Sequence, residues 1–441
     1  MDITLRPARI CGTIDIPGSK SHTIRALLIA LFANGVSTLH NALDSQDTQA
    51  CIELCRRLGA RITFKTDIPV PTLVIDSTAI ASEKEEITID CANSGTTLYL
   101  ASAMCAAGCT SKSIRFSGDE QLLKRPIGPL LESLRDLGAT IEPKDSTTIP
   151  FTIHGPLDGG RTSIECRTSQ YLSALLLACP MAQSDSTIEV PLLNEKPYVK
   201  MTQYWLEKQK MDYSYNDELS LFHIKGNQHY KPFTECIGGD YSSATFFFCA
   251  AAMTKGTITV NGLDRSDPQG DKAVLSVLEQ MGCTVEWNES GVTLNGPQRL
   301  KAGEFDLNDI PDALPALAVA SCFADGETKL YNVKQARLKE TDRIATMAHC
   351  INELGGSAVE LDDGLEIHPV ESFTAKEIDG CNDHRIAMSM ALASLRSAGS
   401  LTIRGAQTAA VTFPTFFELL AKVSVSNEED PKTSLNSKTS V

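Results

Sequence analysis

The sequence predicts an α/β protein made of six repeated units of helix and strand. An amphipathic stretch with apolar residues at helical spacing runs into a segment that alternates apolar and polar residues, and this pattern recurs about every 70–80 residues. The length of 441 residues, with 42% hydrophobic and 22% charged, is that of an ordinary globular chain with two or three domains of roughly 150 residues. A single open nucleotide-binding sheet is excluded, because it would need shorter steps between strand and helix.

Four copies of the unit carry a glycine between helix and strand. They comprise 51–59 before 61–64, 130–138 before 139–142, 274–282 before 284–287, and 349–355 before 358–361. Two copies lack the glycine, and they comprise 204–211 before 212–215, and 416–422. Glycine just past a helix adopts the left-handed conformation that satisfies the last carbonyl groups, so we expect the four helices to end there.

Polar and charged residues collect where loops open helices. Ser19 or Ser21 can cap a helix that includes 26–31, with Lys20 at its positive end. Pro126 disfavours helix at Arg125 and predicts an extended segment there. The other junctions lie at 93–97, 118–126, 168–170, 309–313, 337–343 and 383–385. Each alone is typical of a capped helix or a solvated face, but together they predict a positively charged cavity that binds anions.

Charge and composition exclude several classes of protein. The net charge of -15 argues against nucleic-acid binding, which needs a basic face. The longest apolar runs, such as 26–32, fall short of the roughly 18 residues of a membrane span. The 14 cysteines form no C-x-x-C pair and the N-terminus shows no secretory pattern, so we expect reduced thiols and a cytoplasmic protein. Residues 425–441 lack periodicity and should be a disordered tail.

Six motifs, taken in order, resemble the signatures of the enolpyruvyl transferase family. They lie at 17–25, 239–244, 269–271, 311–313, 338–343 and 383–388, within a resemblance that runs from about residue 5 to about residue 422. The sister branch that acts on UDP-N-acetylglucosamine typically has Asn after the first lysine and a catalytic Cys near Arg125. Here Ser21 follows Lys20 and residues 118–126 contain no Cys. The chain therefore resembles the branch that acts on shikimate 3-phosphate.

This resemblance implies a two-domain enolpyruvyl transferase fold. It has six βαβαββ units, three in each domain, with helix N-termini facing an interdomain cleft. One domain would be discontinuous and comprise residues 1–18 and 239–424, and the other would be inserted as residues 19–238. We expect a monomer that binds two small-molecule substrates and neither nucleic acid nor a membrane.

The resemblance also implies a reaction. The enolpyruvyl group of phosphoenolpyruvate would pass to the 5-hydroxyl of shikimate 3-phosphate by addition and elimination, giving 5-enolpyruvylshikimate 3-phosphate and phosphate without a metal or a cofactor. Lys20, Asp312 and Glu340 would be catalytic, with Asp312 as a base. The residues implied for phosphoenolpyruvate are Lys20, Gly95, Arg125, Gln170, Arg343 and Arg385. Those implied for shikimate 3-phosphate are Lys20, Ser21, Arg25, Thr168, Ser169, Gln170, Tyr198, Asp312, Gln335 and Lys339.

The chain departs from the family pattern at four positions. Tyr99 and Val411 stand where the family has an Arg and a Lys that contact phosphoenolpyruvate. Gln335 stands for an Asn, and Glu195 for a Ser. Each lost cation could cost about 1.5–3 kcal/mol of binding, so another cation substitutes, the Michaelis constant is high, or the site has drifted. The alternatives to the main hypothesis are a catalytically silent anion-binding paralogue and a transferase with another acceptor.

Overall fold

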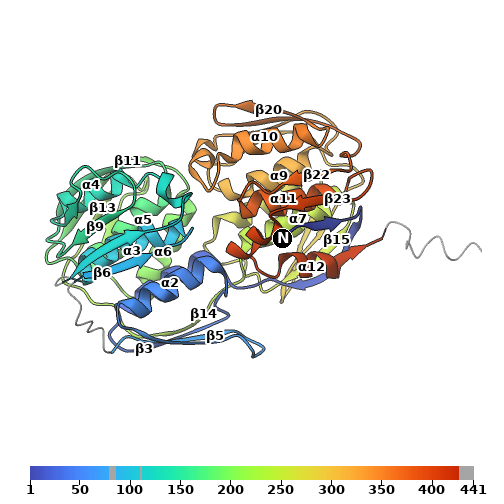
Figure 1. Ribbon diagram of the computed structural model, residues 1–441. Coiled ribbons are helices and arrows are strands. Elements are labelled where there is room, and N and C mark those ends of the chain that lie inside the picture. The colour runs from blue at the N-terminus through green and yellow to red at the C-terminus, as the bar shows by residue number, and fades with distance from the viewer. Residues whose placement is uncertain (79–85, 110–111, 427–441) are drawn as a thin grey trace, which may run out of the picture. The chain divides into compact units, whose positions relative to one another are not determined.

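The computed structural model describes residues 1–78, 86–109 and 112–426, which form two compact units (Figure 1). Unit 1 contains Met1–Ile16, Gly239–Arg265 and the described residues from Asp271 onward. Unit 2 contains Pro17–Gly238 and Ser266–Gly270. Both units alternate helices with small sheets, which confirms the predicted α/β class.

Unit 2 has three four-stranded sheets among its described residues. In spatial order, the first sheet contains β14 (Thr234–Cys236), β3 (Val36–His40), β5 (Thr72–Asp76) and β4 (Arg61–Lys65). The second contains β6 (Glu86–Asp90), β7 (Ser113–Ser117), β9 (Phe151–His154) and β8 (Thr140–Glu142). The third contains β10 (Gly160–Cys166), β11 (Ser186–Leu193), β13 (Leu221–Ile224) and β12 (Tyr213–Tyr215). The helices are α1 (Lys20–Leu31), α2 (Gln46–Arg57), α3 (Gly95–Gly108), α4 (Gly128–Asp136), α5 (Ser169–Ala178) and α6 (Lys196–Lys208), with short 3-10 segments η1 (Leu122–Lys124) and η2 (Cys179–Met181).

Unit 1 also has three sheets among its described residues. In spatial order, the first sheet contains β16 (Thr284–Trp287), β17 (Gly291–Asn295), β15 (Thr257–Asn261), β2 (Arg9–Asp15) and β24 (Ser424–Val425). The second contains β18 (Glu304–Asp306), β19 (Thr328–Tyr331), β21 (Gly364–His368) and β20 (Ser357–Leu361). The third contains β1 (Ile3–Leu5), β23 (Leu401–Arg404) and β22 (Glu377–Asp379). The helices are α7 (Tyr241–Met253), α8 (Val274–Gln280), α9 (Leu314–Ser321), α10 (Arg343–Glu353), α11 (His384–Ser394) and α12 (Phe416–Val423). The 3-10 segments are η3 (Gly270–Ala273), η4 (Pro311–Ala313), η5 (Lys334–Leu338) and η6 (Ala406–Val411).

One pairing pattern recurs through the sheets. In the sheet of β6 to β9, β6 pairs parallel with β7, which pairs antiparallel with β9, which pairs antiparallel with β8. The sheets of β10 to β13 and of β18 to β21 repeat this order. These three units are continuous in sequence, as expected for βαβαββ units.

The other three sheets borrow a strand from a remote part of the chain. Strand β14 pairs with β3, β2 pairs with β15, and β1 pairs with β23. Among the described residues the sheet of β1 has three strands. The repeat is therefore regular in architecture but is not six uninterrupted copies in sequence.

The predicted glycine-terminated helices are confirmed. Gly59, Gly138, Gly282 and Gly355 follow α2, α4, α8 and α10 with φ between 80° and 106°. At each of these ends the residue after the glycine donates its N–H to a carbonyl five residues earlier, as Ala60 does to Cys55 at 3.0 Å. Helix α6 closes in the same way without glycine, since Lys210 takes φ 56° and Met211 N–H donates to Leu206 O at 2.9 Å.

The disordered tail was predicted to begin at Val425, but Val425 lies in a strand. Val425 pairs with Arg9 in the ladder between β24 and β2, because α12 packs Phe416, Leu420 and Val423 into the core of unit 1 and carries the chain onto β2. Residues 427–441 lie outside the described residues.

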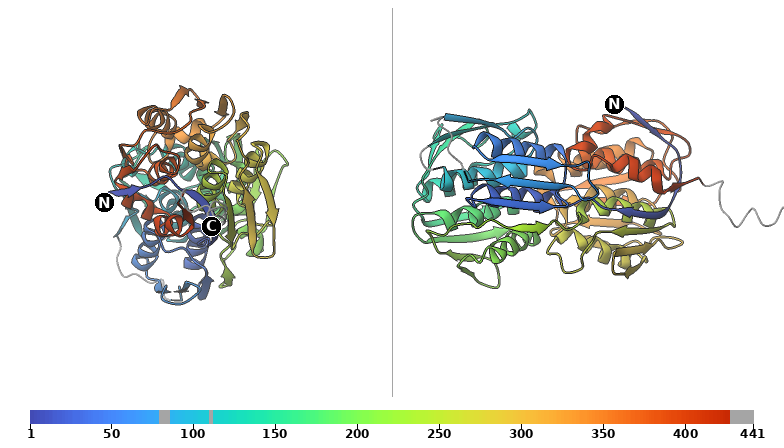
Figure 2. Two further views of the ribbon diagram at one scale, coloured as in Figure 1. Left: turned by 90° about the vertical axis from the view of Figure 1, so that its right-hand side faces the viewer. Right: turned by 90° about the horizontal axis from the view of Figure 1, so that it is seen from below.

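Each unit has its own apolar core. Helices α1, α3 and α5 in unit 2, and α7, α9 and α11 in unit 1, are buried on nearly every side, as their apolar sequences require. The views in Figure 2 show the helices of each unit against its sheets. Helix α3, with 14 residues, is among the longest of the described part, and no helix there has the length and apolarity to cross a membrane.

Two of the four points where the chain passes between the units are held by backbone hydrogen bonds inside each unit. In unit 1, Ile16 N–H donates to Asn261 O at 3.2 Å and Gly239 N–H donates to Gly262 O at 3.0 Å. In unit 2, Ser19 N–H donates to Gly238 O at 2.9 Å. The two crossings at 16–17 and 238–239 are thus held by neighbouring backbone on both sides.

Candidate active site

Helix α1 opens with two of the predicted site residues, Lys20 and Ser21. Ser19 is the cap, since its Oγ accepts the N–H of His22 at 3.4 Å. Lys20 Nζ lies 3.1 Å from Asp47 Oδ2 in the first turn of α2, and both side chains are largely buried. Asp47 was missed by the sequence analysis, because nothing in the chain order shows that α2 starts beside Lys20. The ion pair holds the lysine in place at the helix N-terminus.

A buried network anchors the next residue, His22. Trp205 Nε1–H donates to His22 Nδ1 at 2.9 Å, and His22 Nε2 lies 3.2 Å from Asp267 Oδ1. Because an indole N–H can only donate, the hydrogen-bond pattern assigns the ring proton to Nε2. Burial alone would raise the pKa of Asp267, but the hydrogen bond from His22 helps to lower it overall. The first turn of α1 is therefore held rigidly.

Arg25, predicted to hold a substrate anion, is fully buried and links three helices. Its Nε donates to Thr202 Oγ1 at 2.9 Å, and its Nη1 donates to Ser21 O at 3.1 Å. Its Nη2 donates to Ser173 Oγ at 3.4 Å and to Tyr198 O at 3.3 Å. Burial lowers the pKa of Arg25 to about 10. This guanidinium joins α1, α5 and α6 near their N-terminal ends.

Gly95 begins α3 behind the cap Ser94, whose Oγ accepts the N–H of Thr97 at 3.3 Å. The Arg125 guanidinium lies so close to Gly95 that a Cβ at this position would collide with Arg125 Nη1. Arg125 has extended backbone, φ -77° and ψ 128°, as Pro126 predicts. Glycine thus allows a cation to lie directly over a helix N-terminus.

Tyr99, where the resemblance leads us to expect an arginine, supports the same segment. Its hydroxyl donates to Pro126 O at 3.2 Å, and the Tyr171 hydroxyl donates to the same carbonyl at 2.6 Å. The two rings meet edge to face with centroids 5.4 Å apart. Burial raises the pKa of Tyr171, so it remains a neutral donor. The pair fixes the backbone that carries Arg125.

Helix α5 begins at Ser169, and its cap Thr168 accepts the N–H of Gln170 at 3.5 Å. Gln170 Oε1 is buried and has no hydrogen-bond partner among the described residues. Glu195, where the resemblance leads us to expect a serine, is 2% exposed and lies against this N-terminus. Tyr198 is half-buried in the first turn of α6.

In unit 1, Arg343 is the centre of a buried ionic network. Its Nε lies 2.8 Å from Asp383 Oδ2, its Nη1 lies 2.9 Å from Asp312 Oδ1, and its Nη2 bonds Glu340 Oε2. Burial alone would lower the pKa of Arg343, but the charges of Asp383, Glu340 and Asp312 raise it overall. Burial likewise would raise the pKa of Asp383, and the charge of Arg343 lowers it overall.

Asp312 is contacted by two further cations. Arg385 Nη2 lies 3.0 Å from Asp312 Oδ2 and also donates to Ser242 Oγ at 2.7 Å, while Lys339 Nζ lies 3.8 Å from Asp312 Oδ1. The three cations of this cluster are Lys339, Arg343 and Arg385, and its three carboxylates are Asp312, Glu340 and Asp383. Each of the three cations in this cluster of unit 1 therefore lies within 3.8 Å of a carboxylate.

His384 follows Asp383 at the start of α11, and both of its ring nitrogens are buried without a hydrogen-bond partner among the described residues. Burial lowers the pKa of His384 to about 3. It is therefore a neutral ring at physiological pH.

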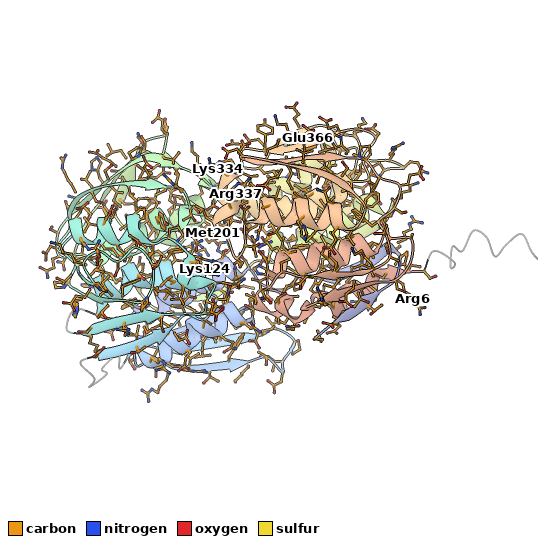
Figure 3. All side chains as sticks on the ribbon, turned by 45° about the horizontal axis from the view of Figure 1, so that its top comes forward. Arg6, Lys124, Met201, Lys334, Arg337 and Glu366 are labelled. Carbon is orange, nitrogen blue, oxygen red and sulfur yellow. The ribbon has the colours of Figure 1, made fainter. Side chains whose placement is uncertain are left out.

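Two neighbouring segments carry residues that the sequence grouped with this cluster. Gln335 Nε2 donates to Asn308 O at 3.1 Å and is buried. Arg337, which Figure 3 labels with Lys334 on η5, bonds Asp342 at 2.7 Å and Glu360 at 2.8 Å. Arg337 thus supports α10 and β20, and none of these contacts reaches the carboxylates around Arg343.

Two groups of side chains in the described residues have the donors and spacing for a metal ion. Glu340, Asp383 and His384 form the first, but the Arg343 guanidinium already pairs with both carboxylates. Glu327, Glu366 and His368 form the second, with each carboxylate 3.5 Å from the His368 ring, and Figure 3 labels Glu366. Neither group gives a reason to expect a metal in the site.

The predicted site residues fall into two sets. Unit 2 carries Lys20, Ser21, Arg25, Gly95, Arg125, Thr168, Ser169, Gln170 and Tyr198. Unit 1 carries Asp312, Gln335, Lys339, Glu340, Arg343 and Arg385. The predicted residues of unit 1, with the exception of Gln335, lie in one ionic network.

Comparison with known proteins gives a consistent result. Residues 5–420 match the family described as EPSP synthase (3-phosphoshikimate 1-carboxyvinyltransferase). The 3-phosphoshikimate 1-carboxyvinyltransferase of Ruminiclostridium cellulolyticum is 43% identical, over 95% of this chain and 97% of the relative. That of Acetivibrio thermocellus is 43% identical over 96% and 98%. A solved structure of EPSP synthase from Acinetobacter baumannii is 26% identical with a TM-score of 0.79, covering 96% of this chain and 98% of that chain.

Proposed function

The chain belongs to the family of EPSP synthases, the 3-phosphoshikimate 1-carboxyvinyltransferases, and from that premise we propose how its residues share the reaction. The enzyme transfers the enolpyruvyl group of phosphoenolpyruvate to the 5-hydroxyl of shikimate 3-phosphate, in the shikimate pathway of aromatic amino-acid biosynthesis. Two anionic substrates must be brought together, so the residues that neutralise and orient charge are the ones to assign.

In this proposal the helix N-termini of unit 2 bind the phosphate and ring of shikimate 3-phosphate. Ser21, Thr168 and Ser169 offer hydroxyl and backbone donors at the starts of α1 and α5. Tyr198 lies against the ring, Gln170 and Lys20 contact both substrates, and Arg25, which joins the three helices, contacts shikimate 3-phosphate. Asp312, Gln335 and Lys339 from unit 1 complete this subsite.

Phosphoenolpyruvate is held by Arg125 and the N–H of Gly95 from unit 2, and by Arg343 and Arg385 from unit 1. Guanidinium groups bind carboxylate and phosphate through charge-assisted, often bidentate hydrogen bonds. Arg343 and Arg385 now pair with Asp312. An arriving anion would take over these cations and free the Asp312 carboxylate.

The chemistry follows from this exchange. In the addition, the 5-oxygen bonds to C2 of phosphoenolpyruvate, C3 takes up a proton, and the hydroxyl proton leaves to a base. In the elimination, the bond from C2 to the phosphate oxygen breaks and C3 loses a proton. We assign the hydroxyl proton to Asp312 and the other proton transfers to Lys20 and Glu340. The observation that carries this assignment is the buried network that holds Asp312 and Glu340 on one guanidinium.

A phosphate-release assay with both substrates tests the assignment. The wild type should turn over, and Lys20→Met should lose about 10²–10⁴-fold in kcat, because a positioned proton carrier contributes about that much. Lys65→Met, at the exposed end of β4, removes the same charge from a residue with no assigned role and should behave as wild type. Equal activity of the two variants would overturn the role of Lys20.

We also propose that unit 1 and unit 2 are the discontinuous and inserted domains, with the loop at 266–270 belonging to the inserted one, and that the enzyme is a cytoplasmic monomer. The 14 cysteines, 11 of them buried, suit a reducing compartment. Sedimentation at micromolar concentration tests the monomer, which a species of twice the mass would contradict.

A further inference from the structure

Glu195 places a carboxylate where the proposed function needs a phosphate. Its Oε2 accepts hydrogen bonds from Ser169 Oγ at 2.7 Å, from Ser169 N–H at 3.0 Å and from Thr168 Oγ1 at 3.2 Å. These three donors form the N-terminal end of α5, a helix of 10 residues. The side chain is 2% exposed, so solvent does not compete for it.

The backbone holds Glu195 at this position. Residue 195 has φ 57° and ψ 42°, a left-handed conformation that is uncommon for a residue with a side chain. Asn194 N–H donates to Cys166 O at 3.1 Å, and Tyr198 N–H donates to Glu195 O at 3.1 Å. The carboxylate can therefore leave the N-terminus of α5 only by rotation of its own side chain.

We propose that Glu195 is a specificity-determining residue that competes with the 3-phosphate of the acceptor for the N-terminus of α5. This inference rests on the proposed function, because the phosphate subsite is the one assigned there. The dipole and N–H groups of a helix N-terminus favour an anion, but two anions on the same donors repel each other. The acceptor binds only after the Glu195 carboxylate has rotated away, and part of its phosphate binding energy is used in that displacement.

This competition has a defined signature. It weakens the binding of ligands that carry the phosphate and leaves the binding of unphosphorylated ligands unchanged. The difference in affinity between shikimate 3-phosphate and shikimate is therefore smaller than it would be without Glu195. Removing the charge at residue 195 widens that difference. A carboxylate that only braces α5 against α6 would affect both ligands alike, or neither.

Calorimetric titration of inorganic phosphate, shikimate 3-phosphate and shikimate tests this in the full-length protein. Glu195→Ser and Glu195→Gln should each bind phosphate and shikimate 3-phosphate at least about tenfold more tightly than wild type. Their affinity for shikimate should be unchanged. Glu195→Gln keeps the size of the side chain, and Glu189→Gln, exposed on β11, controls for the general loss of a negative charge.

The outcomes separate this inference from the proposed function. Unchanged or weaker phosphate affinity in both Glu195 variants, with wild-type thermal unfolding, overturns the inference even if the wild type turns over. Tighter phosphate binding in both variants supports it even if the wild type shows no turnover, in which case the proposed function fails. If Glu189→Gln binds phosphate more tightly to the same extent, the loss of one negative charge anywhere explains the effect, and the inference is overturned.

Discussion

At the scale of single residues, burial without a partner makes His384 a source of pH dependence. Its pKa is about 3 in the folded protein and about 6.5 in an unfolded chain. Below pH 6.5 the unfolded chain takes up a proton at this ring and the folded protein does not, so stability is lost as the pH falls toward 3. We predict that lowering the pH from 7 to 5 costs the wild type about 2 kcal/mol more unfolding free energy than it costs His384→Gln.

Urea unfolding at both pH values measures this difference. His349→Gln is the matched control, because the His349 side chain is 72% exposed and its removal should leave the pH dependence as in wild type. If wild type and His384→Gln lose the same free energy, His384 is not the group responsible.

Tyr99 shows that a lost charge can become a structural support. Tyr99→Phe removes one of two hydroxyls that bond Pro126 O, so we predict a loss of about 1 kcal/mol in unfolding free energy. The looser Arg125 should raise the KM for phosphoenolpyruvate by about fivefold with little change in kcat. Steady-state kinetics and urea unfolding measure both, and Tyr215→Phe, 47% exposed, is the control. A lower kcat at constant KM would contradict this role.

Sequence reasoning placed the charged residues of the candidate site at helix starts, but it did not identify their ion-pair partners. Local motifs indicate Lys20, Arg343 and Arg385, because each lies at the start of a helix with a serine or aspartate as its N-cap. Asp47 as the partner of Lys20 could not be found, because the pairing depends on how α1 and α2 pack. The carboxylates around Arg343 likewise come from three separate segments of unit 1, and only folding brings them together.

At the scale of elements, helix ends were predictable and strand partners were not. The turn after a helix depends on a few adjacent residues, and glycine at its end is a local signal. The partner of a strand depends on the whole chain. Nothing near residues 9–15 indicates pairing with 257–261, and nothing near 36–40 indicates pairing with 234–236.

The exception among the helix ends leads to a prediction. Lys210 adopts φ 56° at the end of α6, where the equivalent ends have glycine. Lys210→Gly removes the steric cost of a Cβ in this conformation, so we predict a gain of about 1 kcal/mol in unfolding free energy. Lys200→Gly, inside the same helix and exposed, should instead lose about 1 kcal/mol. Chemical denaturation of both variants decides, and a destabilised Lys210→Gly would contradict the account.

At the scale of the whole molecule, sheets of local origin should form before sheets with remote strands. Thr13 pairs with Thr259, whereas Ile114 pairs with Ile153 within a continuous unit. Closing a longer loop costs more entropy before the pairing stabilises it. We predict that in refolding the amides of β7, β11 and β19 gain protection before those of β2 and β14. Pulsed hydrogen exchange measures the order, and simultaneous protection of all six sheets would contradict it.

The tied crossings between the units have a mechanical consequence. Both described ends of the chain belong to unit 1, through β1 and β24. The main segment of unit 2, Pro17–Gly238, is a loop whose base is closed by the backbone bonds at Ile16 and Gly239. Tension applied to the two termini would therefore be borne by unit 1 alone. Unit 2 would bear no tension, and would keep its fold, until β2 has been pulled away from β15.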